Sequence, residues 1–164
     1  MNTDSAAPLS QKERVPIPER AESLRKEKSC GAVVYKKTES GLQFLLEHMV
    51  QGHTSIPKGH VENQETEEET ALREIREEIG LNVKLDTSFR HVINYSPAPG
   101  VTKDVIFFAA ESLPGPMVNQ ESEVAALEWM PYEKALSALT HASDRETLTA
   151  AWRYLTQGGK SIPG

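Results

Sequence analysis

Several features that would assign the chain to a particular class of protein are absent. The sequence has one cysteine, Cys30, among 164 residues, so no disulfide can form within the chain. No apolar run reaches the ~18 residues of a membrane-spanning helix, and the N-terminus has no apolar core of a secretory signal. These absences predict a cytoplasmic protein that has no membrane partner.

Positive charge is also scarce. The 18 Lys and Arg residues are outnumbered by 24 Asp and Glu residues, which gives a net charge of −6. A general surface for polyanions needs an excess of positive charge. We therefore expect no nucleic-acid partner, apart from a capped RNA end, and a phosphate ligand would need a cation between it and this acidic chain.

The composition is otherwise ordinary for one globular domain with a sizeable core. We place this domain at residues 29–158. Residues 1–28 are polar and rich in proline and charge, which predicts a flexible N-terminal extension with a short helix over 19–28. Residues 159–164 are predicted to form a C-terminal tail.

Patterns of apolar and turn-forming residues predict the elements of the domain. Strands are expected at residues 29–35, 42–49, 83–85, 89–95, 105–110 and 124–130. Helices are expected at 67–79, 132–139 and 144–156, the last capped by Ser143 or Asp144. Residues 52–59 are expected to form a turn-rich loop. This order predicts an α+β domain with a mixed sheet between helices. We expect the protein to be a monomer or a homodimer.

The most distinctive stretch covers residues 59–81 and reads GHVENQETEEETALREIREEIGL. Eight of the 17 residues from Glu62 to Glu78 are glutamates. Thr66 and Glu69 have the spacing of a capping box, and negative charge in the first turn of a helix is favoured by the helix dipole. The glutamates at 67–69 therefore have a structural explanation, and Gly80 suits the end of the helix.

A second group of glutamates has no such explanation. At ~100° per residue, Glu77 and Glu78 lie about −60° and 40° from Glu74, so the three share one arc. The apolar stripe beside that arc is predicted to contain Leu72, Ile75 and Ile79. Because the dipole disfavours negative charge near a helix C-terminus, we interpret this arc as a site for a hard cation, Mg²⁺ or Mn²⁺, rather than a solvated acidic face. This predicts metal-assisted hydrolysis of a phosphate compound.

The same stretch resembles the Nudix box, G-x5-E-x7-R-E-U-x-E-E-x-G-U, in which U is a bulky aliphatic residue. Its fixed positions are filled by Gly59, Glu65, Arg73, Glu74, Ile75, Glu77, Glu78, Gly80 and Leu81. The resemblance implies the Nudix fold, an α/β/α sandwich in which the box forms a loop, a helix and a loop. It also implies Mg²⁺-dependent hydrolysis of a nucleoside diphosphate linked to another group.

The resemblance also implies roles for individual residues. The expected metal ligands within the box are Glu74, Glu77, Glu78 and the carbonyl oxygen of Gly59. Arg73 is expected to orient the carboxylates through a salt bridge, and Glu65 to brace the box loop. Members of the family differ in their general base, which leaves Glu74 and Glu123 as alternatives.

Within the family, the chain resembles the asymmetrical diadenosine tetraphosphate hydrolases. The shared features are Cys30-Gly31, the run from Pro57 to Glu62, Asn94-Tyr95, Lys103, and Glu123 six residues before Trp129. The roles that this resemblance implies are phosphate contacts for Lys58, His60 and Lys103, a nucleotide contact for Tyr95, and a further metal ligand, Glu123, from a mobile loop. Taken singly, these residues also fit plain structural roles, as surface charges, a loop histidine and a strand-end tyrosine.

Two aromatic residues of that pattern are missing. The position of a tryptophan before the Pro-Lys-Gly run is near Thr54, and a tyrosine before Trp129 is replaced in Leu127-Glu128. Tyr95 remains for stacking, which contributes ~1–3 kcal/mol per base. The leading substrate is diadenosine tetraphosphate, cleaved to ATP and AMP. The alternatives are a nucleoside triphosphate, an ADP-sugar, a capped RNA end, a diphosphoinositol phosphate, or a nucleotide-binding module without catalysis.

Overall fold

A computed structural model of the protein describes residues 25–120 and 122–157. The strands are β2 (Arg25–Thr38), β3 (Gly41–Met49), β4 (Thr54–Ser55), β5 (Lys58–His60), β6 (Val83–Ala98), β7 (Val101–Ser112) and β8 (Val124–Pro131). The helices in this part of the chain are α2 (Glu67–Ile79), α3 (Tyr132–Ala138) and α4 (Ala142–Thr156). None of these helices is long and apolar enough to cross a membrane.

The strands form one sheet in the order β4-β3-β2-β7-β6, with β5 paired to β2 and β8 paired to β3. Strand β3 pairs antiparallel with three other strands, β2, β4 and β8. The predicted α+β architecture is confirmed.

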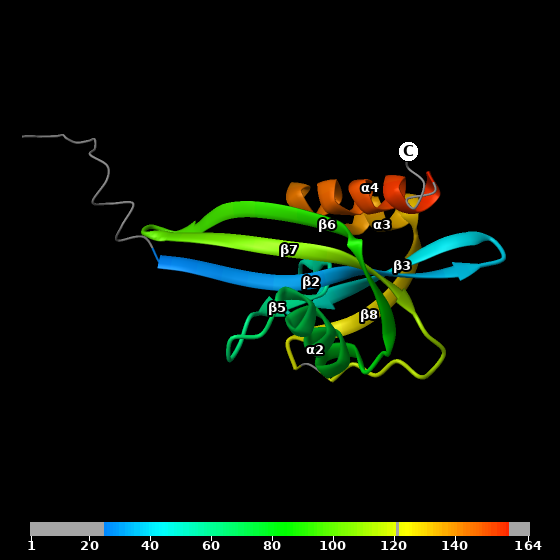
Figure 1. The fold of residues 1–164 in the computed structure, drawn as a ribbon. Coiled ribbons are helices and arrows are strands. Elements are labelled where there is room, and N and C mark those ends of the chain that lie inside the picture. Colours follow the sequence, from blue (N-terminus) through cyan, green and yellow to red (C-terminus); the bar gives the residue numbers. More distant parts are fainter. Residues whose placement is uncertain (1–24, 121, 158–164) are drawn as a thin grey trace, which may run out of the picture. The chain divides into compact units, whose positions relative to one another are not determined.

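The helices cover both faces of this sheet. Figure 1 shows α2 on one face and the pair α3 and α4 on the other. Because successive side chains of a strand point to opposite faces, β3 sends Phe44 and Leu46 into the core under α3 and α4, and Leu45 into the core under α2. The box helix α2 is therefore held against a closely packed apolar surface.

The described residues form two compact units. The larger contains residues 28–93 and 105–157, apart from 121, and carries all three described helices. The smaller contains residues 25–27 and 94–104. Within it the Arg25 N–H donates to the Gly100 carbonyl at 2.9 Å, and the Asn94 amide donates to Asp104 Oδ1 at 2.6 Å.

The predictions for the chain ends are corrected in part. Residues 25–28, which were assigned to a flexible extension and its helix, belong to strand β2. The rest of that extension, residues 1–24, and the tail at 159–164 lie outside the described residues. Strand β2 continues past the predicted start because its first residues still find a backbone partner at Gly100.

Three further predictions differ from the structure. The expected loop at 52–59 contains β4 and most of β5, two short strands beside Pro57, whose missing N–H weakens any strand signal. The strands expected at 83–85 and 89–95 are one strand, β6. Helix α4 has His141 as its N-cap instead of Ser143 or Asp144. It starts earlier because Thr140 is fixed by two hydrogen bonds with Thr54, at 2.8 and 3.1 Å.

Candidate active site

Helix α2 begins and ends as predicted. Thr66 Oγ1 accepts a hydrogen bond from the Glu69 N–H at 3.1 Å, and Glu69 Oε1 accepts one from the Thr66 N–H at 2.9 Å, which completes the capping box. Gly80 ends the helix with a φ of 75°, a left-handed conformation that glycine adopts without steric cost. The glutamates of the first turn therefore have the structural role expected for them.

The buried face of α2 sets the exposure of the other glutamates. Its fully buried apolar residues are Ala71, Ile75 and Ile79. Glu78 lies within this face and is 9% exposed, whereas the side chains of Glu74 and Glu77 are 13% and 60% exposed. Leu72 was predicted to lie in the apolar stripe, but it is 36% exposed. The prediction was wrong because the buried arc is centred on Ala71 and Ile75, which turns Leu72 outward.

Arg73 connects the acidic residues of the box. Its Nε and Nη2 donate to the two oxygens of Glu65 at 2.6 and 3.1 Å. Its Nη1 donates to Glu74 at 2.9 Å and to Glu77 at 3.1 Å, and Nη2 also donates to the His60 carbonyl at 2.9 Å. The predicted salt bridges of Arg73 are present, and a planar guanidinium fixes the directions of the carboxylates that it contacts.

Glu65 ties the loop before α2 to the helix. Besides Arg73, its Oε1 accepts from the Glu62 N–H at 3.0 Å and from the Thr70 hydroxyl at 2.8 Å. The hydrogen bond from Arg73, followed by those from Glu62 and Thr70, lowers the pKa of Glu65 to about 2 against the opposing effect of desolvation. Glu65 is therefore ionised at neutral pH and holds the loop in place.

Gly59 lies in β5, opposite Cys30 of β2. A Cβ atom on Gly59 would overlap the carboxyl group of Glu74. Only glycine lets the β5 backbone come this close to the helix. The Gly59 backbone and the Glu74 carboxylate therefore meet at one point of the box.

A further carboxylate, which the sequence reasoning missed, belongs to the same place. Glu47 of β3 is 3% exposed, and its carboxyl group lies within hydrogen-bonding reach of Glu78, as does that of Glu74. Burial raises the pKa of Glu78 far above its usual range, and the negative charges of Glu47 and Glu74 raise it further. The sequence did hold a signal, because a glutamate two positions after Leu45 occupies the core-facing side of an apolar strand.

The donor set of these carboxylates fits a hard divalent cation. Glu78 Oε1 is buried and has no hydrogen-bond donor among the described residues. Within the same part of the chain, no three acidic, histidine or cysteine side chains are arranged so that they hold an ion in this conformation. Arg73 holds Glu74 and Glu77, so binding an ion here requires them to exchange a contact with Arg73 for the cation.

Two residues predicted to contact phosphates lie in β5, beside the box. Lys58 is half-buried, and His60 is exposed with its carbonyl bound by Arg73. Lys58 is also an electrostatic neighbour of Asp144 in α4, where burial raises the pKa of the aspartate and the charge of Lys58 opposes this shift. Strand β5 thus places both residues next to Gly59.

Glu123 lies in a turn just before β8 and is exposed, while its carbonyl accepts from the Val50 N–H at 2.8 Å. The preceding segment is tied to the end of α2. The Val118 N–H donates to the Ile79 carbonyl at 2.7 Å, and the Gln120 side chain donates to the Arg76 carbonyl at 2.9 Å. Val118 and Gln120 are therefore anchored on the box helix.

Tyr95 and Lys103 belong to the smaller unit. Tyr95 is 43% exposed, so its ring is available to a ligand. Lys103 is half-buried in β7, and its carbonyl lies 3.4 Å from the amide nitrogen of Asn94.

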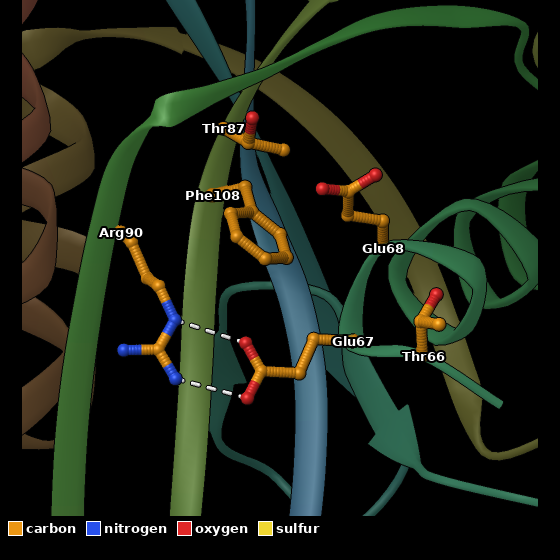
Figure 2. Close-up of a pocket in the computed structure, with 6 residues that line it drawn as sticks. All are labelled: Thr66, Glu67, Glu68, Thr87, Arg90 and Phe108. Carbon is orange, nitrogen blue, oxygen red and sulfur yellow. Dashed lines mark hydrogen bonds and ion pairs between the residues drawn. The ribbon is translucent and has the colours of Figure 1, made fainter. Parts of the chain in front are cut away.

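A cavity of about 460 Å³ opens at the start of α2, at the other end of the helix from Glu77 and Glu78. It is lined by Thr66, Glu67, Glu68, Thr87, Arg90 and Phe108. Figure 2 shows the Arg90 guanidinium facing the Glu67 carboxylate, with two hydrogen bonds of 2.9 Å each. Lys28 donates to the same carboxylate at 3.0 Å, so Glu67 joins α2 to both β2 and β6.

Comparisons with known proteins agree with this architecture. Residues 26–151 match the NUDIX domain family. The asymmetrical bis(5'-nucleosyl)-tetraphosphatase of Mus musculus is 31% identical over 140 residues, which cover 78% of this chain and 95% of the mouse protein. The crystal structure of a Caenorhabditis elegans Ap4A hydrolase binary complex superposes with a TM-score of 0.73 at 26% identity, covering 80% of this chain and 98% of the other.

A third relative matches over a shorter region. The 8-oxo-(d)GTP phosphatase of Mycolicibacterium smegmatis is 37% identical over 94 residues, which cover 57% of this chain and 28% of that protein.

The chain therefore belongs to the Nudix family and has the Nudix fold, which confirms the resemblance found in the sequence. It is a Nudix hydrolase, and enzymes of this family generally use divalent metal ions and act on small nucleotide substrates.

Proposed function

We propose that the protein is an Mg²⁺-dependent, or Mn²⁺-dependent, pyrophosphohydrolase of the cytoplasm whose leading substrate is diadenosine tetraphosphate, cleaved to ATP and AMP. The observation that carries this proposal is the buried Glu78, whose Oε1 has no donor among the described residues and which lies beside Glu74 and Glu47. The mouse relative, named for this substrate class and covered over 95% of its length, supports the choice.

In this proposal the chain's own residues bind and orient the substrate. The cation ligands are Glu74, Glu77, Glu78, Glu123 and the Gly59 carbonyl. A bound divalent cation supplies neutralisation of phosphate charge and a more acidic water. Lys58, His60 and Lys103 bind the phosphates, and the exposed ring of Tyr95 stacks on a base. Water attacks phosphorus while Glu74 or Glu123 accepts its proton, and the P–O–P bridge breaks.

Exchanging a predicted ligand tests the chemistry. Glu77→Gln or Glu78→Gln is expected to lower turnover at least about 100-fold, because an amide holds a divalent cation less strongly than a carboxylate. Steady-state kinetics with Mg²⁺ check this, and circular dichroism verifies the fold. Unchanged turnover in either folded variant would contradict the ligand assignment.

A different substrate is the second candidate, because both positions that lack an aromatic residue are otherwise engaged. Thr54 is buried and shares a 2.9 Å hydrogen bond with His48. Glu128 is paired with the same histidine at 2.9 Å, and the neighbouring Leu127 packs against the core under α2. A nucleoside triphosphate, an ADP-sugar, a capped RNA end or a diphosphoinositol phosphate depends less on a double stack of adenine.

Product analysis on a panel of these compounds in ¹⁸O-labelled water separates the candidates. Diadenosine tetraphosphate should give ATP and AMP, with the label in one of them, and should have the highest kcat/KM. If another compound has a higher kcat/KM, that compound is the preferred substrate and diadenosine tetraphosphate is not. Binding without turnover in saturating Mg²⁺ or Mn²⁺ would instead indicate a nucleotide-binding module without catalysis.

A further inference from the structure

Glu47 occupies a place in β3 where an apolar residue is expected. Its neighbour Leu45, two residues earlier and on the same face, belongs to the core under α2. The backbone places Glu47 opposite Ser55 of β4 on one side and Leu127 of β8 on the other. Glu47 is thus enclosed by the sheet and α2, with 3% of its surface exposed.

Glu47 lies against Glu78 of α2, and a buried charge costs several kcal/mol unless it is paired. The neighbours whose charges raise the pKa of Glu78, Glu47 and Glu74, are both acidic and add repulsion. The Glu78 side chain is itself nine-tenths buried, and its Oε1 has no donor in the part of the chain that the structure describes. The acidic group therefore combines like charge, burial and an unsatisfied acceptor.

Arg73 does not supply the missing positive charge to Glu78. Its hydrogen bonds in the described chain go to Glu65, Glu74, Glu77 and the His60 carbonyl. Glu78 is not among these partners, and it lies on the side of α2 that faces the sheet. A small cation with oxygen ligands satisfies both the charge and the open acceptor.

We propose that Glu47 is an additional ligand of the divalent cation, supplied by the sheet and not by the box helix. The inference rests on the proposed function, which assigns a cation to Glu74, Glu77 and Glu78, and it adds a ligand that the box motif does not contain. Because Glu47 is part of a strand paired on both edges, it fixes the cation relative to the sheet. The box residues fix it relative to α2.

Mn²⁺ binding to the full chain tests this inference without reference to activity. Free Mn²⁺ is measured by electron paramagnetic resonance in titrations of the wild-type protein and of Glu47→Gln. The variant is expected to raise the Mn²⁺ dissociation constant at least about tenfold. The increase in melting temperature on adding Mn²⁺ should shrink in parallel. Glu68→Gln is a matched control, since Glu68 is an exposed glutamate of α2 outside the site, and it should leave both readouts unchanged.

The outcomes distinguish the inference from the function on which it rests. If Glu47→Gln binds Mn²⁺ as tightly as the wild type, Glu47 and Glu78 are only a proton-sharing pair, and the inference is overturned while the proposed function stands. If the wild type binds no Mn²⁺, the proposed metal chemistry itself fails. Should Glu47→Gln not fold, Glu47→Leu, which resembles the neighbouring Leu45, gives the same comparison.

Discussion

Adding a Cβ atom to either of two glycines, Gly31 of β2 and Gly59 of β5, would have different consequences. A Cβ on Gly59 would overlap the Glu74 carboxyl group, which is the end of a side chain. A Cβ on Gly31 would overlap the Pro57 carbonyl and lie 2.7 Å from the Lys58 Cα, which are backbone atoms. The first neighbour can rotate away and the second cannot.

Gly59→Ala should therefore reduce activity more than stability, whereas Gly31→Ala should do the reverse. Displacing the Glu74 carboxylate by about 1 Å is expected to lower turnover about 100-fold. The strain in Gly31→Ala is expected to lower the free energy of unfolding by about 1–3 kcal/mol. Steady-state kinetics and urea denaturation of both variants check the contrast. Equal loss of stability in the two would show that Gly59 has only a packing role.

Individual site residues could be predicted from the sequence where they belong to a motif with fixed spacing. Arg73, Glu74 and Glu77 follow a linear motif, and the salt bridge between Arg73 and Glu77 could be expected from their i,i+4 spacing on one helix. Glu47 could not be placed with them, because it is far away in sequence and only the pairing of β3 in the sheet brings it to Glu78.

Helix α2 is bound to the sheet at its first turn, as well as at the candidate active site near its C-terminal end. Arg90 of β6 makes a two-bond contact with Glu67, and Lys28 of β2 adds a third bond. The hydrogen bonds from Arg90, more than those from Lys28, lower the pKa of Glu67 to about 2, from an ordinary value of 4.5. A lowered pKa means that the folded state binds the proton less tightly than the unfolded chain does.

This linkage predicts a pH-dependent effect of Glu67→Gln. The variant should lose about 1 kcal/mol of unfolding free energy at pH 7. Because the stabilisation from Glu67 is full above pH 4.5 and is lost as the pH falls towards 2, the difference from wild type should shrink over that window. Urea denaturation at pH 7, 5 and 3 measures it. A difference that stays constant with pH would contradict the ion-pair explanation, and a double-mutant cycle with Arg90→Gln isolates the pair.

Elements were predictable where local signals were complete. Helix α2 has a capping box, an apolar stripe and a terminal glycine, and it was found with its observed bounds. Strands β4 and β5 were missed because two or three residues carry no periodicity, and their pairing partners in β3 and β2 are set by the fold. The start of α4 was missed for a similar reason, since Thr54 fixes the turn before it.

For the molecule as a whole, the single cysteine is a probe of how the sheet opens. Cys30 is fully buried in β2 opposite Gly59. Burial, more than the nearby charge of Glu67, raises the pKa of its thiol to about 11. Both effects suppress the reactive thiolate in the folded protein.

Alkylation of Cys30 by iodoacetamide at pH 8 should therefore be at least about 100-fold slower in the native protein than in urea. Mass spectrometry of the labelled chain over time gives both rates. Added Mn²⁺ should slow native labelling further, because a ligand that binds only the folded state lowers the population of open states. Fast labelling of the native protein would show that β2 and β5 separate readily.

The pairing of β3 with β8 also sets an order of events during synthesis. Residues 43–49 leave the ribosome long before residues 124–131, with which they pair. Until β8 has been made, the edge of β3 that it covers is open, and Glu47 is a hydrated carboxylate on an incomplete sheet. Its charge is dehydrated only when Leu127 arrives opposite it, so enclosing that charge is among the last steps of assembly. A nascent chain halted before Val124 would carry the whole box sequence and still lack the enclosed glutamate.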